Sequence, residues 1–447
     1  MAVAQGLQFR KGDPMRQTMA GTRPLTILTI NSGSSSVKFS LFRLGNDEEQ
    51  RRLRGAIERI GLRSGVFRVE NEGGETLVER HENVQNHEMA FDVLFAWLDG
   101  VSGEPPPDAV GHRIVHGGNH FVQPHVVTEK VMKTMMGLTP LAPDHLPHEI
   151  MAIRAVKRSH PKLPQVACFD TAFHRNMPRA ARIYALPRFL EQEGVRRYGF
   201  HGLSYEYIME ELAKEAGSGT VPGRVIIAHL GNGASMAAVR DAMCVDTTMG
   251  FTPSGGLMMG TRSGDLDPGV ILYLLEEKSM RPSTVNDMIN QHAGLIAVSG
   301  KTSDMADLLA VEGTDAHAAE AVMLFCYEAK KFAGALTAVL GGLDAFVFTG
   351  GIGENAPAVR ERICSGLEFL GIEIDAEANR VNGSVISAPA SRVVVRVMKT
   401  DEELMTARHT FNLLRRREVG GSPSSDPCPK PFHEERLDGV IDHENEK

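Results

Sequence analysis

Three apolar, strand-like segments each end in a tight turn rich in glycine and serine, and this repeated pattern constrains the fold more than any other feature. The turns are NSGSSSVK (Asn31 to Lys38), GNGAS (Gly231 to Ser235) and TGGIGEN (Thr349 to Asn355). Glycine tolerates positive φ and lets backbone N–H groups approach an anion closely, so a strand followed by such a turn is typical of a phosphate site. A single Ser/Gly run is more often a hairpin or a linker. Three such runs on apolar strands favour a nucleotide-binding enzyme.

Length, charge and cysteine usage narrow the class of protein. A chain of 447 residues exceeds what one core organises, so we expect two domains. The formal charge of −8, with both signs well mixed, disfavours nucleic acid or an anionic membrane as a partner. No apolar run has the ~18 residues of a membrane helix, and the first 24 residues lack the apolar stretch of a signal peptide. The cysteines stand singly, which disfavours a disulfide framework or a zinc site and favours the cytoplasm: Cys168, Cys244, Cys326, Cys364 and Cys428.

The order of the elements predicts a mixed α/β fold. From Leu25 the pattern alternates as in an antiparallel meander, followed by a helix over 87–100 and a strand over 109–118. A second strand-rich stretch, 223–248, repeats the layout of the first, which indicates an ancient duplication. Helical periodicity dominates afterwards, over 267–278, 316–342, 357–371 and 402–417. Residues 1–24 are expected to be a poorly ordered extension, and the Gly-, Pro- and Ser-rich residues 418–447 a disordered tail.

Two segments resemble familiar nucleotide signatures without matching them in context. Residues 294–302, GLIAVSGKT, end like a Walker A loop, but the first glycine is one residue too early and no clear strand precedes it. Residues 351–356 match the dinucleotide pattern G-x-G-x-x-A and follow a strand, which leaves a dinucleotide-dependent oxidoreductase as an alternative. One adenosine-phosphate site between two domains accounts for all three glycine turns better.

Polar side chains also gather in short motifs where catalysis would need them. Each one alone could be a satisfied core group or a helix cap. Together they supply two arginines, three histidines and two carboxylates, the set that phosphoryl transfer uses to neutralise charge and hold magnesium. They are Arg113, His116, His145, Asp170, His201, Arg262 and Glu402.

From about Leu25 to Arg417 the chain resembles the acetokinase family of the sugar kinase, Hsp70 and actin superfamily. Nine motifs in family order carry the resemblance: NSGSSSVK, GHRIVHGG, LAPDHLP, FDTAFH, RYGFHG, HLGNGAS, GFTPSGGLMMGTRSGDLDPG, FTGGIGEN and TDEELMTAR. The resemblance implies two duplicated ribonuclease-H-like domains, as in actin-like ATPases, closing over a cleft and usually forming a homodimer. We expect one domain of residues 25–170 plus 398–417 for acyl and phosphate binding, and a nucleotide-binding domain of residues 171–397.

The resemblance also implies an activity and its residues. The family transfers a phosphoryl group reversibly from ATP to acetate by direct in-line transfer, giving acetyl phosphate and ADP. Asp170, His201 and Arg262 would be catalytic. The short-chain carboxylate would be bound by Arg113, Val115, His145, Phe200 and Pro253. Asn31 and Glu402 would hold Mg²⁺, with Mn²⁺ as an alternative ion.

Nucleotide contacts would come from the glycine turns and one further segment. The implied residues are Ser34, Ser36, Lys38, His229, Leu230, Gly231, Asn232, Gly233, Asp304, Met305, Ala306, Gly351, Ile352, Gly353, Glu354 and Asn355. Physical chemistry agrees with the activity, because a carboxylate is already ionised at neutral pH and needs nearby cations more than a base. Asp170 is therefore better suited to positioning groups or metal than to removing a proton.

Three departures from the family pattern bear on specificity. Ala306 replaces an arginine that contacts the nucleotide, which puts the phosphoryl donor in question. Asp144 stands where a leucine is usual in the acyl pocket, and Asp401 adds a charge before the metal-site glutamate. Propionate or butyrate kinase, or a non-catalytic nucleotide-binding regulator on the same fold, are the alternatives.

Overall fold

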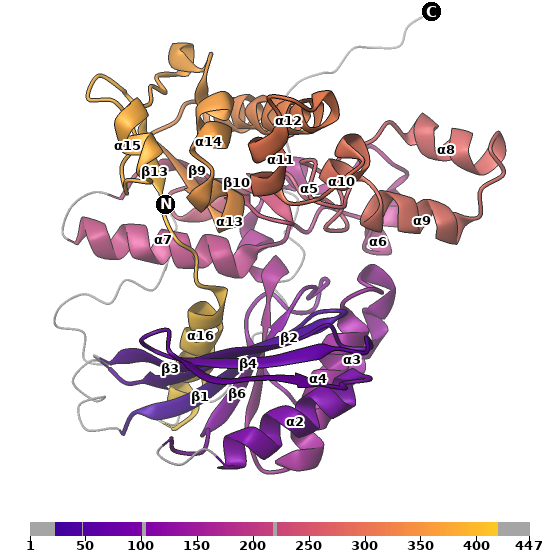
Figure 1. Cartoon of the computed structure of the whole chain (residues 1–447), viewed down its shortest axis with the longest axis vertical. Coiled ribbons are helices and arrows are strands. Elements are labelled where there is room, and N and C mark those ends of the chain that lie inside the picture. The colour runs from indigo at the N-terminus through magenta and orange to yellow at the C-terminus, as the bar shows by residue number, and fades with distance from the viewer. Residues whose placement is uncertain (1–22, 47, 101–103, 218–220, 419–447) are drawn as a thin grey trace, which may run out of the picture.

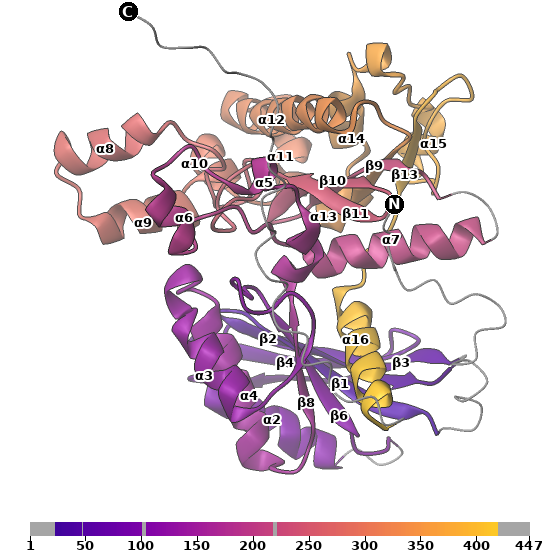
Figure 2. The same ribbon diagram turned by 180° about the vertical axis from the view of Figure 1, so that it is seen from behind.

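The computed structural model describes residues 23–46, 48–100, 104–217 and 221–418. Within them the chain forms two halves, each built on one sheet with helices against it (Figures 1 and 2). The predicted extension and tail lie outside the described residues except at their edges. There, Arg23 forms an ion pair with Asp108 at 2.7 Å, and the last helix continues to Glu418.

The first sheet has eight strands in the order β5-β4-β3-β2-β1-β6-β8-β7. Strands β1 to β5 pair antiparallel with their sequence neighbours, which confirms the predicted meander, whereas β6 and β8 extend the sheet in parallel with β1. The continuous apolar run of β1 suits this central position, where both faces are covered. The strands are β1 (Leu25–Ser32), β2 (Ser36–Leu44), β3 (Glu49–Glu58), β4 (Gly65–Asn71), β5 (Thr76–Glu82), β6 (Ala109–Ile114), β7 (His125–Val126) and β8 (Gln165–Phe169).

The second sheet has five strands in the order β11-β10-β9-β12-β13 and repeats the pattern of the first. Its first three strands form an antiparallel meander, and β12 and β13 add in parallel with β9. This common layout is the one expected from the sequence of residues 223–248. The strands are β9 (Arg224–Leu230), β10 (Ala234–Arg240), β11 (Met243–Thr247), β12 (Ala345–Thr349) and β13 (Val394–Val397).

Helices cover both sheets and connect them. The C-terminal helix α16 packs on β1, β2, β6 and β8, so the end of the described chain returns to the first sheet (Figures 1 and 2). Helix α12 covers the second sheet through β10 and β9. The longer helices are α2 (His87–Gly100), α3 (Glu129–Gly137), α4 (Leu146–Ser159), α7 (Gly202–Ala216), α8 (Pro268–Glu276), α9 (Pro282–Gln291), α12 (Ala316–Leu340), α14 (Pro357–Cys364) and α16 (Glu402–Glu418). The shorter ones are α5 (Arg179–Arg182), α6 (Arg188–Gln192), α10 (Gly294–Ser299), α11 (Met305–Val311), α13 (Gly350–Asn355), α15 (Ala376–Arg380), and the 3₁₀ turns η1 (Thr139–Leu141), η2 (Asp170–Asn176) and η3 (Glu368–Leu370).

The three glycine turns differ in structure. The first two join antiparallel strands as hairpins, and each is closed by a backbone hydrogen bond, from Gly33 to Ser36 at 2.8 Å and from Gly231 to Gly233 at 3.0 Å. The third is no open turn, because β12 passes directly into helix α13. The Walker-like segment forms α10, and its Lys301 pairs with Asp315, so this lysine is already bound within the protein.

The four cysteines in the described ranges, Cys168, Cys244, Cys326 and Cys364, are free thiols buried in the interior. No helix among the described residues combines the length and apolarity needed to cross a bilayer.

The start of α7 depends on a glycine. A Cβ at Gly202 would overlap the carbonyl oxygen of Asp170 and lie 2.9 Å from Cβ of Phe173. We therefore expect Gly202→Ala to lower the free energy of unfolding by about 1–3 kcal/mol. Gly334→Ala is the matched control, because nothing lies within 4 Å of a Cβ there in mid-α12, and it should stabilise by about 0.5–1 kcal/mol. Urea denaturation measures both, and an unchanged Gly202→Ala variant would contradict the close approach.

Candidate active site

Three parallel strands of the first sheet end at one place and carry polar side chains there. Asn31 lies near the end of β1, Arg113 near the end of β6, and Asp170 directly after β8. Pairing of Ile30 with His112, and of Ile114 with Phe169, brings these ends into register. The carboxyl ends of parallel strands are where open α/β sheets place ligands.

Arg113 is the centre of this cluster. Its Nη2 donates to Oδ2 of Asp170 at 2.5 Å and its Nη1 donates to Oδ1 of Asn31 at 3.2 Å. Its Nε forms an ion pair with Glu402, the first residue of α16, at 3.3 Å. The two candidate metal ligands, Asn31 and Glu402, therefore both contact the arginine expected to bind the substrate carboxylate.

The cluster places three carboxyl groups around one arginine. Burial raises the pKa of Asp170, the nearby Glu402 raises it further, and Arg113 opposes both. Burial alone would lower the pKa of Arg113, but Asp170, Glu402 and Glu149 raise it above its ordinary value. Arg113 thus stays protonated, and one cation serves three carboxyl groups.

The second half contributes two stacked histidines. The rings of His201 and His229 lie 4.2 Å apart, and a serine hydroxyl holds each ring, Ser235 for His201 and Ser204 for His229, both at 2.8 Å. Burial lowers the pKa of His201, with His229 and two arginines lowering it further, so the ring is neutral at pH 7. His201 also adopts φ 57°, a left-handed conformation that is uncommon outside glycine and typical of functional sites.

Arg262 faces the same place from the loop before α8. Its Nη1 donates to the carbonyl of Pro253 at 2.8 Å, and no carboxylate in the described chain forms an ion pair with it. Burial and the positive charge of Arg113 lower its pKa, while Asp144 opposes this. Burial together with Arg262 and Arg113 lowers the pKa of His145 to about 4. The two arginines are thus close enough to repel, and a bound anion would relieve that repulsion.

The turn after β9 reaches this site, and α13 lies beside the turn. A Cβ on Gly233 would be 3.2 Å from Nε2 of His201 and 3.8 Å from Nη1 of Arg262, and one on Gly231 would be 3.9 Å from the backbone nitrogen of Gly351. The segment His229 to Gly233 therefore lies between the catalytic candidates and the start of GGIGEN. Leu230 itself is fully buried and packs in the core of this half.

Within α13 the side chains have structural partners. Oε1 of Glu354 accepts from the backbone of Gly350 at 3.0 Å, and Asn355 donates to the carbonyl of Gly351 at 2.9 Å. Gly351 and Asn355 are exposed, Ile352 is half-buried, and Gly353 is buried. What this helix can offer an adenosine is therefore mainly its exposed backbone.

Two groups of predicted nucleotide contacts have no side-chain hydrogen bond or ion pair with the cluster around Arg113 in the described chain, although Lys38 is the strand partner of Asn31. Ser34 and Lys38 are exposed and Ser36 half-buried at the first hairpin. Asp304 caps α11 by accepting from the backbone of Ala306 at 2.7 Å, and Met305 is buried in the core. Asp304 and Met305 therefore have local structural roles.

The departures from the family pattern can now be located. Asp144 is exposed before α4, so its carboxylate is not buried in an apolar pocket, although its charge acts on Arg262. Asp401 pairs with Arg51 at 2.6 Å and caps α16, so the extra charge expected beside the metal ligands is already neutralised.

The apolar acyl-site candidates lie in one cluster with a carboxyl group that the sequence did not reveal. Val115 and Phe200 are buried in the same core cluster, and the half-buried Pro253 is joined to Arg262. The backbone N–H of Val115 donates to both oxygens of Glu149, at 3.1 and 3.2 Å. Glu149 is 2% exposed, and burial raises its pKa to about 8. Glu149 lies on α4, an ordinary amphipathic helix, so nothing in the sequence marked it as a buried site residue.

Arg360 is a second residue that the sequence analysis missed. It is fully buried, and its Nη1 donates to the carbonyls of Gly353 and Glu354 at 2.9 and 3.1 Å, so it holds the end of α13. Burial lowers its pKa to about 10. The sequence does not predict this contact, because Arg360 reaches these carbonyls only in the tertiary fold.

The residues around Arg113 suit a hard divalent cation. Amide and carboxylate oxygens are the ligands that Mg²⁺ takes, and Asn31, Asp170 and Glu402 supply them within one cluster. Oδ1 of Asp170 is buried and has no hydrogen-bond partner in the described chain, an unsatisfied oxygen that a cation would satisfy. His, Cys, Asp and Glu alone form no metal-binding group of three among the described residues, so the amide of Asn31 would be needed.

Glu149 should make the stability of the protein depend on pH. Its pKa is higher in the folded protein, about 8, than its ordinary value of 4.5, so the folded state binds the proton more tightly. The free energy of unfolding should then fall as pH rises from about 4.5 to about 8. We expect Glu149→Gln to flatten this decline between pH 5 and 9 in thermal melts, while Glu320→Gln, an exposed site on α12, keeps it. Parallel curves for all three proteins would contradict a protonated Glu149.

Comparison with known proteins identifies the family. The model described as the acetokinase family matches residues 26–408. The acetate kinase of Rhodopseudomonas palustris (strain ATCC BAA-98 / CGA009) is 47% identical over 392 residues, which cover 87% of this chain and 98% of that protein. The acetate kinase of Rhizobium meliloti is 45% identical over 390 residues, with the same coverage.

Solved structures agree with the sequence matches. The acetate kinase of Porphyromonas gingivalis has a TM-score of 0.79 and 37% identity, covering 87% of this chain and all of that one. A propionate kinase from Francisella tularensis subsp. tularensis SCHU S4 has a TM-score of 0.82 and 35% identity, covering 87% and 99%. The expected fold class, two related α/β units of the actin-like ATPase type, is thereby confirmed, and the dinucleotide-dependent oxidoreductase finds no support. The chain belongs to the acetokinase family.

Proposed function

We propose that this protein is an acetate kinase that transfers a phosphoryl group reversibly between ATP and acetate, giving acetyl phosphate and ADP. The observation that carries the proposal is the approach of Arg113 and Arg262 in a buried site, with three histidines beside them. The matches to acetate kinases support acetate as the acceptor, and the match to a propionate kinase keeps propionate as the nearest competitor.

The chemistry needs cations more than a base. An acetate oxygen attacks the γ-phosphorus, the bond from that phosphorus to the β–γ bridging oxygen breaks, and ADP leaves with the electron pair. No proton moves, because acetate is ionised at neutral pH. Arg113 would hold the acetate carboxylate, and Arg262 would spread its charge over the transferred phosphoryl oxygens, so that one anion can approach another.

Neutral histidines fit this mechanism. Burial keeps the pKa of His145 and His201 low, so at pH 7 each ring can donate one hydrogen bond without adding a charge that would need its own counter-ion. His201 would donate a hydrogen bond to the phosphoryl group during its transfer. His145 would border the acyl site, together with Val115, Phe200 and Pro253. His229 to Gly233 would present backbone N–H groups to the nucleotide phosphates.

Magnesium is the proposed metal, with Mn²⁺ as an alternative. When bound, it would neutralise phosphate charge and orient the nucleotide. Asn31 and Glu402 would hold it, and Asp170 would position Arg113 and complete the oxygen set. Arg113, which contacts all three residues, would keep them together when no nucleotide is present.

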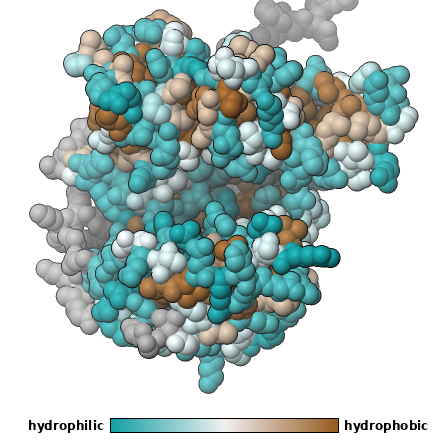
Figure 3. Space-filling view, in the orientation of Figure 1, coloured by the Kyte–Doolittle hydropathy of each residue, from teal (hydrophilic) through white to brown (hydrophobic). Residues whose placement is uncertain are grey.

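We further propose a division into residues 25–170 plus 398–417, which would bind acyl and phosphate groups, and residues 171–397, which would bind the nucleotide. Figure 3 shows a groove between the two halves, lined mainly by hydrophilic residues, that would take ATP. The exposed backbone of GGIGEN would border the adenosine.

A homodimer in the cytoplasm completes the proposal. Large apolar side chains are exposed on the segment around α6 and on α8, a feature typical of a surface that another chain covers. They are Ile183, Leu186, Phe189, Val270, Leu272 and Tyr273, which are 40–55% exposed. Free, singly placed cysteines are consistent with the reducing cytoplasm.

Trapping acyl phosphate with hydroxylamine tests the activity directly. The purified protein with ATP and Mg²⁺ should form hydroxamate with acetate, and propionate and butyrate rank the acyl specificity. Arg113→Ala should lose at least about a hundredfold in kcat/KM for acetate, because a charge-assisted contact to the substrate is removed. Arg54→Ala is the control, since Arg54 lies in an exposed ion pair on β3.

The outcomes separate the alternatives. No hydroxamate with any acid, together with intact ATP binding, would favour the non-catalytic regulator. Normal turnover in a folded Arg113→Ala variant would remove Arg113 from the site. Because that variant leaves Asp170 and Glu402 unpaired, thermal melting must accompany the kinetics.

Ala306 should set the affinity for the donor. We expect Ala306→Arg to lower KM for ATP several-fold, because an arginine at the start of α11 could reach the nucleotide. Ala306→Gln is the control of similar length without charge and should change KM little. Initial rates with ATP, GTP and pyrophosphate measure the effect. A strong preference of the unmodified protein for pyrophosphate would instead overturn ATP as the donor.

A further inference from the structure

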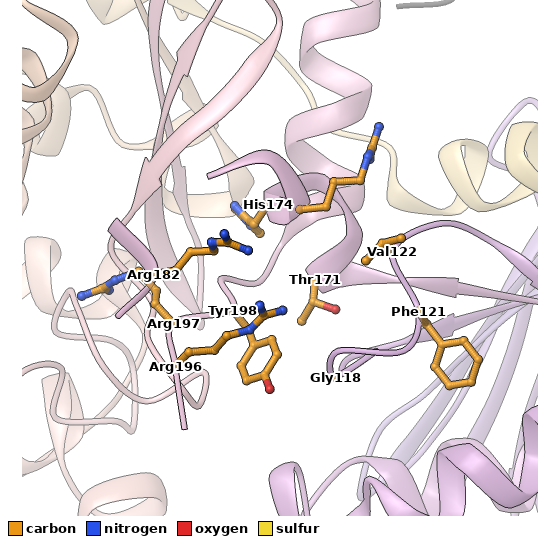
Figure 4. A pocket seen from close by; sticks show the side chains of 10 residues that line it. Gly118, Phe121, Val122, Thr171, His174, Arg182, Arg196, Arg197 and Tyr198 are labelled. Atoms are coloured by element: carbon orange, nitrogen blue, oxygen red, sulfur yellow. The ribbon is translucent and has the colours of Figure 1, made fainter. Parts of the chain in front are cut away.

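Arginines line a second recess that the proposed reaction does not use. Figure 4 shows this recess, with Arg182, Arg196 and Arg197 near Tyr198. Arg175 is a fourth arginine of its lining. Its floor includes residues of η2, the turn that begins at Asp170, so the recess adjoins the active site without sharing Arg113 or Arg262.

Two of these arginines, Arg182 and Arg196, each have one donor without an acceptor. The Nε atoms of Arg182 and Arg196 are buried and have no hydrogen-bond partner in the described chain. Neither guanidinium forms an ion pair with a carboxylate among the described residues. Arg196 instead lies over the ring of Tyr198, 4.9 Å from its centroid, as Figure 4 shows. Half-buried arginines with free N–H donors are costly unless something accepts from them.

The charges around Arg182 and Arg196 do not compensate the positive charge of these two arginines. Burial lowers the pKa of Arg182, and the positive charges of Arg196 and Arg179 lower it further. The nearest acid, Glu191, is already held by Arg179 through two contacts of 2.6 and 2.7 Å. The recess therefore collects positive charge that the described chain leaves uncompensated.

The other two arginines are committed to the backbone. Nη1 of Arg197 donates to the carbonyls of Thr247, Thr248 and Met249 at 2.9–3.1 Å. Nη1 of Arg175 donates to the carbonyl of Ala172 at 3.0 Å. Those contacts fix the walls, whereas Arg182 and Arg196 line the recess with Nε donors that no group of the described chain accepts from.

We propose that this recess binds a small oxyanion, a phosphate or a carboxylate, with Arg182 and Arg196 as its principal ligands. A guanidinium fork matches two oxygens of either group, and two forks suit a dianion. The bound anion supplies the missing counter-charge and the missing acceptors at once.

Titration calorimetry with inorganic phosphate tests the proposal, with succinate as a second arm and chloride holding the ionic strength constant. The wild-type protein should bind at least one of the two dianions, and their relative affinity identifies phosphate or carboxylate as the preferred group. Arg182→Gln and Arg196→Gln should each weaken this binding about tenfold or more. Arg188→Gln, at an exposed arginine on α6 outside the recess, should not.

The active site could also take phosphate, so a reciprocal variant is needed. Binding that survives in Arg262→Gln and is lost in Arg182→Gln supports the recess, and the opposite result overturns it. Absence of binding by either anion in the wild type also overturns it, and needs no variant to fold. A further outcome is that the wild type binds neither anion and that Arg182→Gln dissociates a dimer. This result would overturn the proposal and assign the recess to an acidic side chain of a partner chain. Arg182→Lys keeps the positive charge but lacks the two-pronged guanidinium. Its thermal melting shows whether weaker anion binding comes from misfolding or from the loss of the guanidinium contacts.

Discussion

The contact between Arg113 and Asp170 is the interaction on which the arrangement of the site depends. A buried carboxylate and guanidinium tolerate little displacement, because each is costly without the other. Holding them together requires β6 and β8 to end side by side, and adding Glu402 requires the chain to return from the second half through α16. The interleaved course of the chain, with its last helix on its first sheet, therefore follows from the need to collect these side chains.

The ends of the strands in the second half differ in chemistry from those in the first. Its strands β9 and β12 are parallel neighbours, as β1 and β6 are, but their ends carry glycine-rich segments. Backbone N–H groups at the turn after β9 offer partial charges that need no counter-ion, whereas Arg113 needs three carboxyl groups around it. The ends of the parallel strands thus carry formally charged side chains in the first half and glycine-rich backbone in the second.

Much of this could be predicted from the sequence, because local rules decide it. The alternation of Leu25 to Glu82 gave the meander, and the repeated layout of 223–248 gave the second sheet. The form of GGIGEN could not be predicted as readily, since a glycine-rich run favours an open turn until a buried arginine binds its carbonyls. Glu149 was missed for a related reason. An acidic residue on an amphipathic helix is normally solvated, and only the packing of α4 beneath Val115 buries this one.

The same reasoning explains why unpaired arginines mark the molecule's anion sites. In the described chain Arg360, although fully buried, has its donors taken by carbonyl and amide oxygens, and Arg408 is surrounded by glutamates. Arg262 and Arg182 differ, because each is at least half-buried beside another arginine and none of the described carboxylates pairs with it. Evolution readily supplies a glutamate where a structural arginine needs one. Where a desolvated arginine pair is left without one, the counter-charge comes from outside the chain, as a bound anion.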